Sequence, residues 1–565
     1  MDEDPVSTFF QSPVWCMEWY RSYQDKFRPL VMIAARGESL VGIVPLAVEI
    51  TTGRLAFAGD NMSDYRDVAA APGYREGVIA ELIRLHRSGQ YPNFLRIGPT
   101  QPESETLQIV RALCRKGTGA RAIARFHPCW RLWFSPDGST KKLTSKESVR
   151  RHISYYKRQG AVALERIRTK EAWDAVKQEF FDQHSLRQLQ ASRPVSFDDP
   201  RKREFHDALL QRGGDSIRVS ALRVGGRLLA AHYGYVWKGV LYWGAPAFDV
   251  REEKHSPGQI LLALLLQEAE ASGLRGVDFT LGTEEFKKRF GNSCVDLPSV
   301  EIYSGARRYF ARRLRDRVVS GAKSATIKVA GAPNWEKSVE GGKAAAAKAR
   351  RAYELGLGDS LSRLARRGLS ALGDDRRGLI FIATPADVRQ VAPSLVGNET
   401  SSFHTDEVGD LLRWEGGSRS TASEIETTVK GVADSLRKGH TLHTVLVNDR
   451  LAGWGWSYWP QEPAFITETQ TTLAFEPGSV SLYGFYVLPE FRGRKLYQAL
   501  LSRILNDRFA EGAERAYIMC LETNVASRKA IERAGFRLVS VHRFSRVLWK
   551  KRRQEQESGA SSRER

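Results

Sequence analysis

The clearest pattern of apolar and polar positions lies between residues 480 and 536. Residues 480–487 form a β-branched and aromatic run that ends before Pro489, a residue that cannot donate to a strand ladder. Apolar residues then recur on one face of a predicted helix, namely Leu496, Leu500, Leu501, Ile504 and Leu505. Residues 516–521 form a second apolar strand, and another helix runs from Asn524, a good N-cap, to Gly535. The pattern predicts a strand, turn, helix, strand, turn and helix in succession.

A basic turn separates the first of these strands from its helix. It contains Arg492, Gly493, Arg494 and Lys495. A helix that begins here presents unpaired backbone N–H groups and the positive end of its dipole, and the side chains add cations at the same point. The turn therefore predicts a binding site for a pyrophosphate group.

These residues resemble the GNAT acetyltransferases, whose acyl-CoA site is a strand, a turn reading Arg/Gln-x-x-Gly-x-Gly/Ala, and a later Asn-x-x-Ser/Ala helix that ends in Gly-Phe. The second motif matches this sequence, and the first matches in part. Lys495 and Tyr497 stand where the family prefers small residues, and Ile531 stands where it often has a tyrosine that acts as general acid. The alternative interpretations are a GNAT-like fold that is kept for its shape after the chemistry is lost, and an unrelated αβα sandwich.

The resemblance implies that acetyl-CoA or another acyl-CoA is the cosubstrate and that no metal takes part. The residues that it assigns to this site are Phe485, Val487, Arg492, Gly493, Arg494, Lys495, Leu496, Asn524 and Ser527. Thr467 to Leu473 and Tyr483 to Val487 would flank the cleft that admits the pantetheine arm, and Glu468 is the base candidate there.

The N-terminal part repeats the same order of elements. A strand-like run ends at Phe248, Ser256-Pro257-Gly258 starts a long apolar helix, and a strand follows at 277–282. The predicted fold class is therefore α/β (α+β), with several GNAT-like mixed-sheet domains. The predicted domains are 1–140 and 141–305 as two GNAT-like halves, 306–377 as a basic helical connector, 378–550 as a C-terminal GNAT domain, and 551–565 as a disordered tail.

Residues 8–305 also resemble the cellulose-biosynthesis acetyltransferase-like family of the CelD/BcsL type, and more distantly the Fem peptidoglycan aminoacyltransferases. The pieces that carry this resemblance are the early Phe10-Gln-Ser-Pro-Val-Trp15, the loop 59–67, Tyr242-Trp243 with Phe248-Asp249, Ser-Pro-Gly, and Asp278-Phe with Gly282 and Phe286 to Phe290. The Fem relation implies two GNAT-like halves with a cleft between them.

The resemblance places one set of candidate residues around that cleft. Asp278 would accept a proton from an amine or hydroxyl, and Lys287 would steady developing negative charge. In the alternative interpretation Asp278 caps a turn and Lys287 is solvated. The candidate substrate-binding residues are Asp64, Tyr65, Tyr242, Trp243 and Glu284. His184 and His232 are further base candidates.

Charge and length set the remaining expectations. The chain has 565 residues and a formal charge of +21, and its length predicts two to four domains. From residue 304 to 378 there are 18 Lys and Arg against 7 Asp and Glu, so the connector is a candidate surface for an anionic membrane, RNA or an acidic partner. The basic helix around Arg150 is a second candidate for RNA or a phosphorylated donor.

Cysteine usage and hydropathy point to a reducing compartment. The five cysteines are scattered and lack CxxC spacing, which suggests neither a disulfide frame nor a zinc site. The sequence has no apolar run of membrane-spanning length and no basic N-terminal signal pattern. We expect a cytoplasmic protein, with peripheral contact at the inner membrane face through the connector as an open alternative.

Together these features predict an acyl-CoA-dependent N- or O-acyltransferase of the GNAT type. By resemblance its acceptor is a polysaccharide or cell-envelope precursor, as in exopolysaccharide biosynthesis. The alternatives are a Fem-like aminoacyl-tRNA-dependent transferase and a partly degenerate GNAT binding or scaffold protein.

Overall fold

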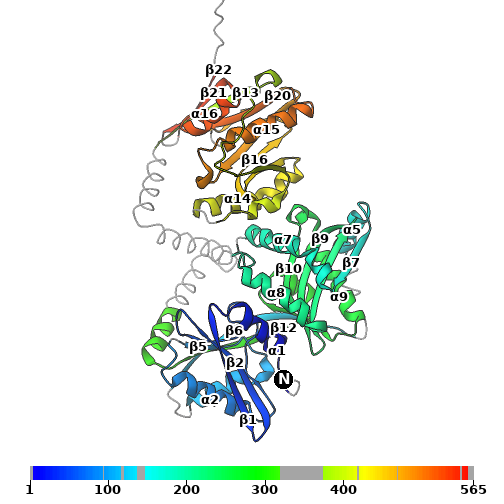
Figure 1. The fold of residues 1–565 in the computed structure, drawn as a ribbon, viewed down its shortest axis with the longest axis vertical. Helices are drawn as coiled ribbons and strands as arrows, with labels where there is room; N and C mark the ends of the chain where they lie inside the picture. The colour runs from blue at the N-terminus through cyan, green and yellow to red at the C-terminus, as the bar shows by residue number, and fades with distance from the viewer. Residues whose placement is uncertain are drawn as a thin grey trace, which may run out of the picture. The chain divides into compact units, whose positions relative to one another are not determined.

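The structure is a computed structural model that describes residues 4–92, 94–115, 120–135, 147–191, 193–317, 373–415, 419–466, 469–547 and 550–557. Its contacts divide the chain into two compact units. Unit 1 comprises Met1–Gln188 and Arg193–Ala325, and unit 2 comprises Leu189–Ser192 and Thr326–Arg565. Each unit is a mixed α/β structure built around an eight-stranded sheet (Figure 1).

Unit 1 contains a small and a large sheet. The small sheet has the order β1-β2-β3, with β4 paired to β2. Its strands are β1 (Phe27–Arg36), β2 (Ser39–Glu49), β3 (Leu55–Phe57) and β4 (Ala69–Ala70). The large sheet has the order β5-β12-β6-β11-β10-β9-β8-β7. Its strands are β5 (Phe94–Ile97), β6 (Arg121–Trp133), β7 (Val162–Ile167), β8 (Ile217–Val224), β9 (Arg227–Trp237), β10 (Val240–Phe248), β11 (Gly276–Leu281) and β12 (Ser293–Tyr303).

The large sheet runs through both predicted halves of the N-terminal part. Strand β12 comes from the end of the second half, yet it pairs antiparallel with β5 and β6 of the first half. Strand β6 in turn pairs with β11. Strands from both sides of the boundary predicted near residue 140 therefore belong to one sheet.

The helices of unit 1 cover both sheets. They are α1 (Pro13–Ser22), α2 (Arg75–Arg87), α3 (Thr106–Arg115), α5 (Glu147–Lys157), α6 (Lys170–Asp174), α7 (Lys177–Gln190), α8 (Pro200–Arg212), α9 (Pro257–Ala271) and α10 (Glu285–Phe290), with a further helix over 306–317. Helices α2 and α3 pack on one face of β5 and β12 through a cluster that includes Ile79, Leu82 and Val300. Helix α9 packs against β10 and β11.

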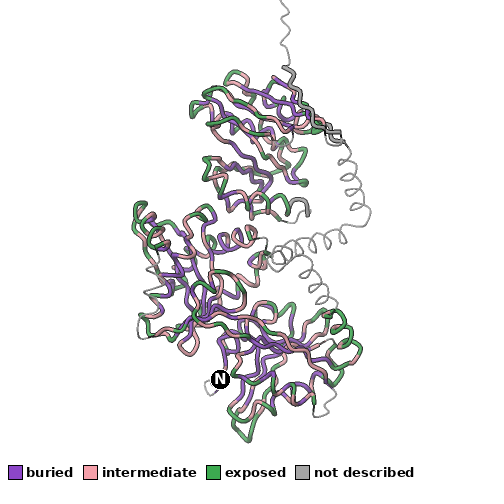
Figure 2. Tube along the Cα trace, turned by 180° about the vertical axis from the view of Figure 1, so that it is seen from behind, coloured by how far each residue is buried: buried purple, intermediate pink, exposed green. Residues whose placement is uncertain are grey.

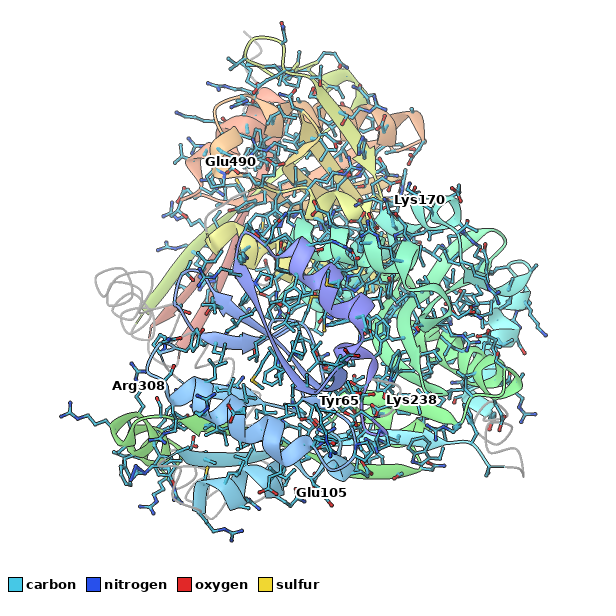
Figure 3. All side chains as sticks on the ribbon, turned by 60° about the horizontal axis from the view of Figure 1, so that its bottom comes forward. Tyr65, Glu105, Lys170, Lys238, Arg308 and Glu490 are labelled. Carbon is cyan, nitrogen blue, oxygen red and sulfur yellow. The ribbon has the colours of Figure 1, made fainter. Side chains whose placement is uncertain are left out.

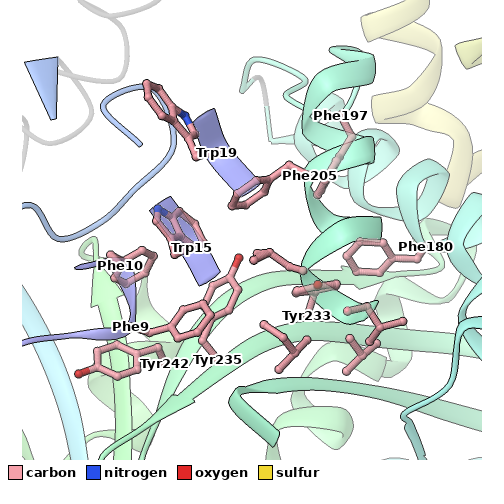
Figure 4. Packing of buried hydrophobic residues seen from close by; sticks show 14 of the residues in the cluster. Phe9, Phe10, Trp15, Trp19, Phe180, Phe197, Phe205, Tyr233, Tyr235 and Tyr242 are labelled. Carbon is pink, nitrogen blue, oxygen red and sulfur yellow. The ribbon is translucent and has the colours of Figure 1, made fainter. Parts of the chain in front are cut away.

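An aromatic core joins the N-terminal segment to the second predicted half. Phe9, Phe10 and Trp15 lie against Tyr235, and Trp15 meets Phe205 edge to face at 4.7 Å between ring centroids (Figure 4). Large aromatic side chains bury the most apolar surface per residue, so such a cluster contributes strongly to stability. Buried segments follow the strands of each unit, while exposed segments lie at its periphery (Figure 2).

Unit 2 has a sheet of the order β14-β15-β16-β19-β20-β13-β21-β22 and a small hairpin, β17-β18. Its strands are β13 (Gly373–Ala383), β14 (Ser401–Thr405), β15 (Thr441–Val447), β16 (Arg450–Tyr458), β17 (Ala464–Ile466), β18 (Thr471–Leu473), β19 (Ser479–Val487), β20 (Arg515–Leu521), β21 (Arg537–Val547) and β22 (Lys550–Glu557). Its helices are α14 (Arg419–Arg437), α15 (Leu496–Ala510) and α16 (Val525–Arg533). The predicted elements between residues 480 and 536 are thus β19, α15, β20 and α16.

Two predictions concern the segments that flank the C-terminal domain. The disordered tail predicted for 551–565 is wrong for residues 551–557, because β22 pairs antiparallel with β21. An edge strand tolerates a charged sequence, since one side of it faces solvent. Residues 558–565 lie outside the described residues, as does the connector between 318 and 372. No helix in the described ranges combines the length and apolar character needed to cross a bilayer.

Candidate functional site

In unit 2, two parallel neighbouring strands separate and leave an opening. Strands β19 and β20 pair from Ser479↔Arg515 to Leu482↔Ile518, and the pairing stops there. The next residues of β19 include Gly484, which has a φ of +66°, a conformation that favours glycine. The remainder of β19 then borders a cavity of about 610 Å³, which we call the α15 cavity.

The α15 cavity is lined by cations and by the beginning of a helix. The residues around it are Phe485, Tyr486, Val487, Phe491, Arg492, Gly493, Lys495, Leu496, Tyr497, Gln498, Asn524, Ala526, Ser527, Ala530 and Arg533. Three of them carry positive charge, and none of the described lining residues is acidic. The Nε of Arg492 donates to the Val487 carbonyl at 3.1 Å, and its guanidinium lies over the ring of Tyr486. This combination suits an anionic, phosphate-bearing ligand.

Eight of the nine residues predicted for the acyl-CoA site line this cavity, and Arg494 does not. The Arg494 guanidinium instead donates to both carboxylate oxygens of Glu399 at 2.7 Å and lies over the ring of Phe491. Asn524 caps α16 by accepting a hydrogen bond from the Ser527 N–H at 3.1 Å. The motif spacing predicted the residues of the cavity. It did not distinguish Arg492, which lines the cavity, from Arg494, which holds the turn through Glu399.

Lys495 occupies the backbone conformation that explains the family preference for glycine. It has a φ of +57° and is the N-cap of α15. A side chain in the left-handed region costs about 1–2 kcal/mol, which glycine avoids. Lys495 places an amino group on the lining of the cavity, and its backbone adopts this strained conformation.

We expect Lys495→Gly to raise the free energy of unfolding of unit 2 by about 0.5–1 kcal/mol, because the relieved strain exceeds the added flexibility of the unfolded chain. Chemical denaturation followed by the fluorescence of the unit 2 tryptophans measures the change. Arg503→Gly on the same helix is the opposite control, since it places glycine in a helix interior and should destabilise by about 1 kcal/mol. A destabilising Lys495→Gly would contradict the strain argument.

Several polar groups near the separation of the strands were not predicted. The Tyr497 hydroxyl lies 3.1 Å from that of Ser527, and its ring lies 5.1 Å from that of Phe485. The Nδ1 of His440 lies 2.6 Å from the Tyr483 hydroxyl on β19. Ile531 is fully buried and does not line the cavity. Glu468 and Thr467 lie outside the described residues.

Unit 1 contains the same local geometry with different chemistry. Strands β10 and β11 pair parallel only from Val240↔Gly276 to Tyr242↔Asp278. Ser256, with a φ of +50°, is the N-cap of α9, which has 15 residues like α15. A cavity of about 340 Å³ borders this helix, and its charged lining residues are one arginine and one glutamate. Unit 1 therefore shares the scaffold but lacks the cationic lining of the α15 cavity.

A second cavity of unit 1, of about 270 Å³, lies beside the separation of β10 and β11, and we call it the cleft cavity. Among the predicted residues it is lined by Asp64, Trp243, Glu284 and Lys287. The base candidate His184 also lines it, together with residues that were not predicted, namely Arg187, Gln188, Arg193, Ser196, Lys202 and His206. Four cations thus face two carboxylates.

Three ionisable groups of the cleft cavity, Asp64, Lys202 and His206, have pKa values shifted toward their neutral forms. Burial raises the pKa of Asp64 to about 6, although Lys287 opposes the shift. Burial lowers the pKa of Lys202 to about 8, and its Nζ donates to the Ser196 hydroxyl at 2.8 Å. Burial also holds the pKa of His206 at about 3. A carboxyl and an amine of this kind exchange protons readily near neutral pH.

Asp64 should make stability depend on pH. Its folded-state pKa of about 6 exceeds the ordinary value of about 3.9 that it has in the unfolded chain. Between these values the folded protein binds a proton that the unfolded chain does not, so this contribution is favourable below pH 4 and is lost as the pH rises through 6. Asp64→Asn should therefore be more stable than the wild type at pH 7.5, and the difference should shrink by pH 4. Urea unfolding at both pH values tests this, and an equal difference at both would contradict it.

Lys287 and Glu284 form a short ion pair at the mouth of the cleft cavity. Lys287 Nζ lies 3.1 Å from Glu284 Oε2 and donates to the Leu281 carbonyl. Arg193 pairs with the other Glu284 oxygen at 3.2 Å. A Cβ added at Gly282 would come within 2.2 Å of Glu284 Oε2. Lys287 is thus buried and paired rather than solvated.

Asp278, Tyr65 and Tyr242 do not line the cleft cavity. Asp278 is 2% exposed, and its carboxylate accepts hydrogen bonds from the Tyr65 hydroxyl at 3.0 and 2.9 Å and from Arg131 Nε at 3.1 Å. Tyr65, labelled in Figure 3, reaches it from the loop that was predicted to contact substrate. These contacts join the loop to β6 and β11. They favour a structural role for Asp278 over proton transfer.

The cleft residues that were not singled out carry weak sequence signals. Lys202 lies within a run of charged residues at the start of α8, and Arg187 lies in the last turn of α7. Runs of charged residues usually lie on solvated helix faces. Only the tertiary packing of α7 and α8 brings Arg187 and Lys202 to the cleft cavity. His184 was weighed as an isolated base, and it now has a pKa well below its usual value because it is buried.

Comparison with known protein families identifies both units. Residues 144–288 match the family described as "Acetyltransferase (GNAT) domain", and residues 408–536 match the family described as "Acetyltransferase (GNAT) family". The chain thus carries a GNAT-superfamily domain in each unit, which confirms the predicted superfamily and fold class. Such domains indicate acyltransferase-type activity.

Solved structures give weaker likenesses. FemX has 11% identity and a TM-score of 0.39, and the match covers 53% of this chain and 92% of FemX. The L-PGS structure from Bacillus licheniformis has 11% identity and a TM-score of 0.34, with 52% and 91% covered. A tandem GNAT protein from the clavulanic acid biosynthesis pathway has 11% identity and a TM-score of 0.22, with 71% and 100% covered. Scores this low carry no argument about activity. The search of curated proteins gave no match.

Proposed function

We propose that unit 2 binds an acyl-CoA and that the protein transfers the acyl group to an amine or hydroxyl. The observation that carries the proposal is the α15 cavity, where Arg492, Lys495 and Arg533 surround the beginning of a helix. The phosphates of CoA match these cations and the first N–H groups of α15. The separated strands β19 and β20 leave room for the pantetheine arm.

In this reaction the acceptor nitrogen or oxygen attacks the thioester carbonyl, the C–S bond breaks, and the acceptor proton must leave. His440 is a candidate to take that proton, since its Nδ1 lies 2.6 Å from the Tyr483 hydroxyl near the point where the strands part. Burial lowers the pKa of His440, which keeps the imidazole neutral and able to accept a proton at pH 7. Glu468 stays a predicted base.

The acceptor is proposed to be an anionic envelope or polysaccharide precursor. The resemblance of residues 8–305 to the CelD/BcsL type suggests the pathway, and the excess of cations in the cleft cavity favours a negatively charged molecule. A cytoplasmic location with peripheral membrane contact is part of the proposal. The helix over 306–317 supports it with several arginines and with Phe310 and Leu314, which are 58% and 64% exposed.

Calorimetric titration of acetyl-CoA into the full chain tests the proposal. We expect one site per chain, because the cavity beside α9 in unit 1 lacks the cationic lining. Free CoA should compete with acetyl-CoA, since the phosphates supply most of the contacts. Absence of binding would remove the CoA-dependent function and leave a degenerate scaffold or a different donor. Two equal sites would contradict the distinction between the units.

A second candidate is transfer from an aminoacyl-tRNA by unit 1. It is favoured by α5, which packs beside α9 and exposes Arg150, Arg151 and Lys157. A polyanion bound here would lie beside α9 without using a CoA pyrophosphate site. RNA binding whose affinity falls steeply with salt, and that Arg150→Ala with Arg151→Ala weakens, would support this candidate. Absence of RNA binding at low salt would remove it.

A further inference from the structure

A third cavity of unit 1 has an unusual concentration of arginines. It has a volume of about 300 Å³, and we call it the arginine cavity. Its lining is Arg66, Arg96, Pro99, Arg125, His127, Leu281, Ser299, Glu301 and Arg312. The residues on β5, β6 and β12 alternate with those that pack under α2 and α3, so the arginine cavity lies on the opposite face of the sheet.

The carboxylates around the arginine cavity are outnumbered. Glu301 is 1% exposed, accepts a hydrogen bond from Arg96 at 2.8 Å, and lies 3.9 Å from Arg125 and 3.5 Å from Arg312. Asp316 pairs with the same two residues, Arg125 at 2.8 Å and Arg312 at 3.8 Å. Three arginines thus share two carboxylates, and Arg66, which pairs with Asp60 at 3.5 Å, adds a fourth cation to the lining.

Two donors at the arginine cavity have no hydrogen-bond acceptor. Within the described part of the chain, the buried Nε atoms of Arg125 and Arg312 make no hydrogen bond, although they lie 3.9 and 3.5 Å from the Glu301 carboxylate. Leaving a buried charged donor unsatisfied costs about 1–3 kcal/mol or more. An ion-pair network that only fastened the helix over 306–317 to the sheet would satisfy these donors and fill the space between them. The arginine cavity and these two Nε–H groups together suit an anion.

The neutral groups of the lining fit the same conclusion. The Nε2 of His127 lies 2.9 Å from the Ser299 hydroxyl. Burial lowers the pKa of His127, and the charges of Arg125 and Arg96 lower it further. The imidazole and hydroxyl can therefore donate or accept hydrogen bonds without adding a fixed charge. Guanidinium groups match phosphate oxygens in geometry as well as in charge.

We propose that the arginine cavity binds a phosphate or diphosphate group of a ligand. This site is separate from the α15 cavity, because it lies in unit 1. It is also distinct from the cleft cavity, although Leu281 borders both. The site does not depend on CoA binding by unit 2.

Titration of inorganic pyrophosphate into the full chain at constant ionic strength tests the proposal. Because the α15 cavity also suits pyrophosphate, the wild type should show two sites. Arg312→Gln should remove one site or weaken it at least tenfold, and Arg492→Ala should remove the other. Arg313→Gln is the matched control, since Arg313 is the next residue of the same helix and donates to the Tyr309 hydroxyl instead. It should leave both sites unchanged.

A second variant and a second probe separate the possible outcomes. Arg125→Gln should reproduce the effect of Arg312→Gln from a different element, and circular dichroism should find both variants folded. Vesicles of phosphatidylcholine with and without phosphatidic acid distinguish a lipid phosphate from a soluble one. The proposal is overturned if the Arg492→Ala variant binds no pyrophosphate. It is also overturned if the site that remains in that variant is equally strong after Arg312→Gln and Arg125→Gln. If the wild type lacks only the site that depends on Arg492, the CoA proposal is overturned and the proposal for the arginine cavity stands.

Discussion

The double replacement of Arg492 and Lys495 by alanine should weaken acetyl-CoA binding about 10²–10³-fold. Both side chains line the α15 cavity at the beginning of α15. A hydrogen bond to a charged group contributes about 1.5–3 kcal/mol, and each 1.4 kcal/mol corresponds to a factor of ten in the dissociation constant. The backbone N–H groups of the helix and Arg533 remain, so we expect residual binding. Calorimetry at fixed ionic strength measures the two affinities.

Two controls make this result specific. Arg503→Ala removes a cation from an exposed position of the same helix, where Arg503 pairs with Asp507 at 2.9 Å. It should change the affinity less than twofold, because exposed charges are screened by salt. Arg494→Ala should have an intermediate and indirect effect, since Arg494 holds the turn through Glu399 and does not line the cavity. If Arg503→Ala weakens binding as much as the double variant, overall charge rather than the α15 cavity governs affinity.

The predictable part of this protein is local in sequence. The strand, basic turn and helix around Arg492 follow from short-range rules, namely apolar period, the proline stop at Pro489 and helix capping. The position of Lys495 in the left-handed region also agrees with a family preference for glycine. The same local rules identified Ser256 as the start of α9 in unit 1, so the repeated scaffold was accessible from sequence.

The remainder depends on contacts between distant residues. Glu399 is 95 positions from Arg494, and nothing in the local pattern connects them. Arg131 is 147 positions from Asp278, so a carboxylate that suited proton transfer by its type is instead held in a buried pair. The sequence predicts that Arg312 is part of a basic connector. In the structure Arg312 packs beside the sheet and lines the arginine cavity. Residue type indicates what chemistry is possible, while packing decides which groups meet.

Asp278→Ala should lower the free energy of unfolding of unit 1 by about 3–5 kcal/mol, because it leaves Arg131 buried and without its charged partner. The side chains of Asp278 and Arg131 are 3% and 6% exposed, so water cannot replace the lost interaction. Tyr65 and Cys129 also lose the acceptor for their hydrogen bonds. Hydrogen exchange at the amides of β11 and β6 should accelerate, whereas the amides of β19 in unit 2 should be unaffected.

The double variant Asp278→Leu with Arg131→Met distinguishes a structural pair from a catalytic carboxylate. Replacing both members of a buried ion pair by apolar residues is often neutral for stability, so the double variant should recover much of the loss seen in Asp278→Ala. If Asp278 acted only in proton transfer, Asp278→Asn would keep wild-type hydrogen exchange and lose turnover alone. If Asp278→Asn shows slow hydrogen exchange, binds acetyl-CoA and does not transfer the acyl group, Asp278 takes part in the reaction. Rapid exchange in Asp278→Asn, with recovery in the double variant, would instead assign Asp278 to the framework that holds the loop 59–67 against β11.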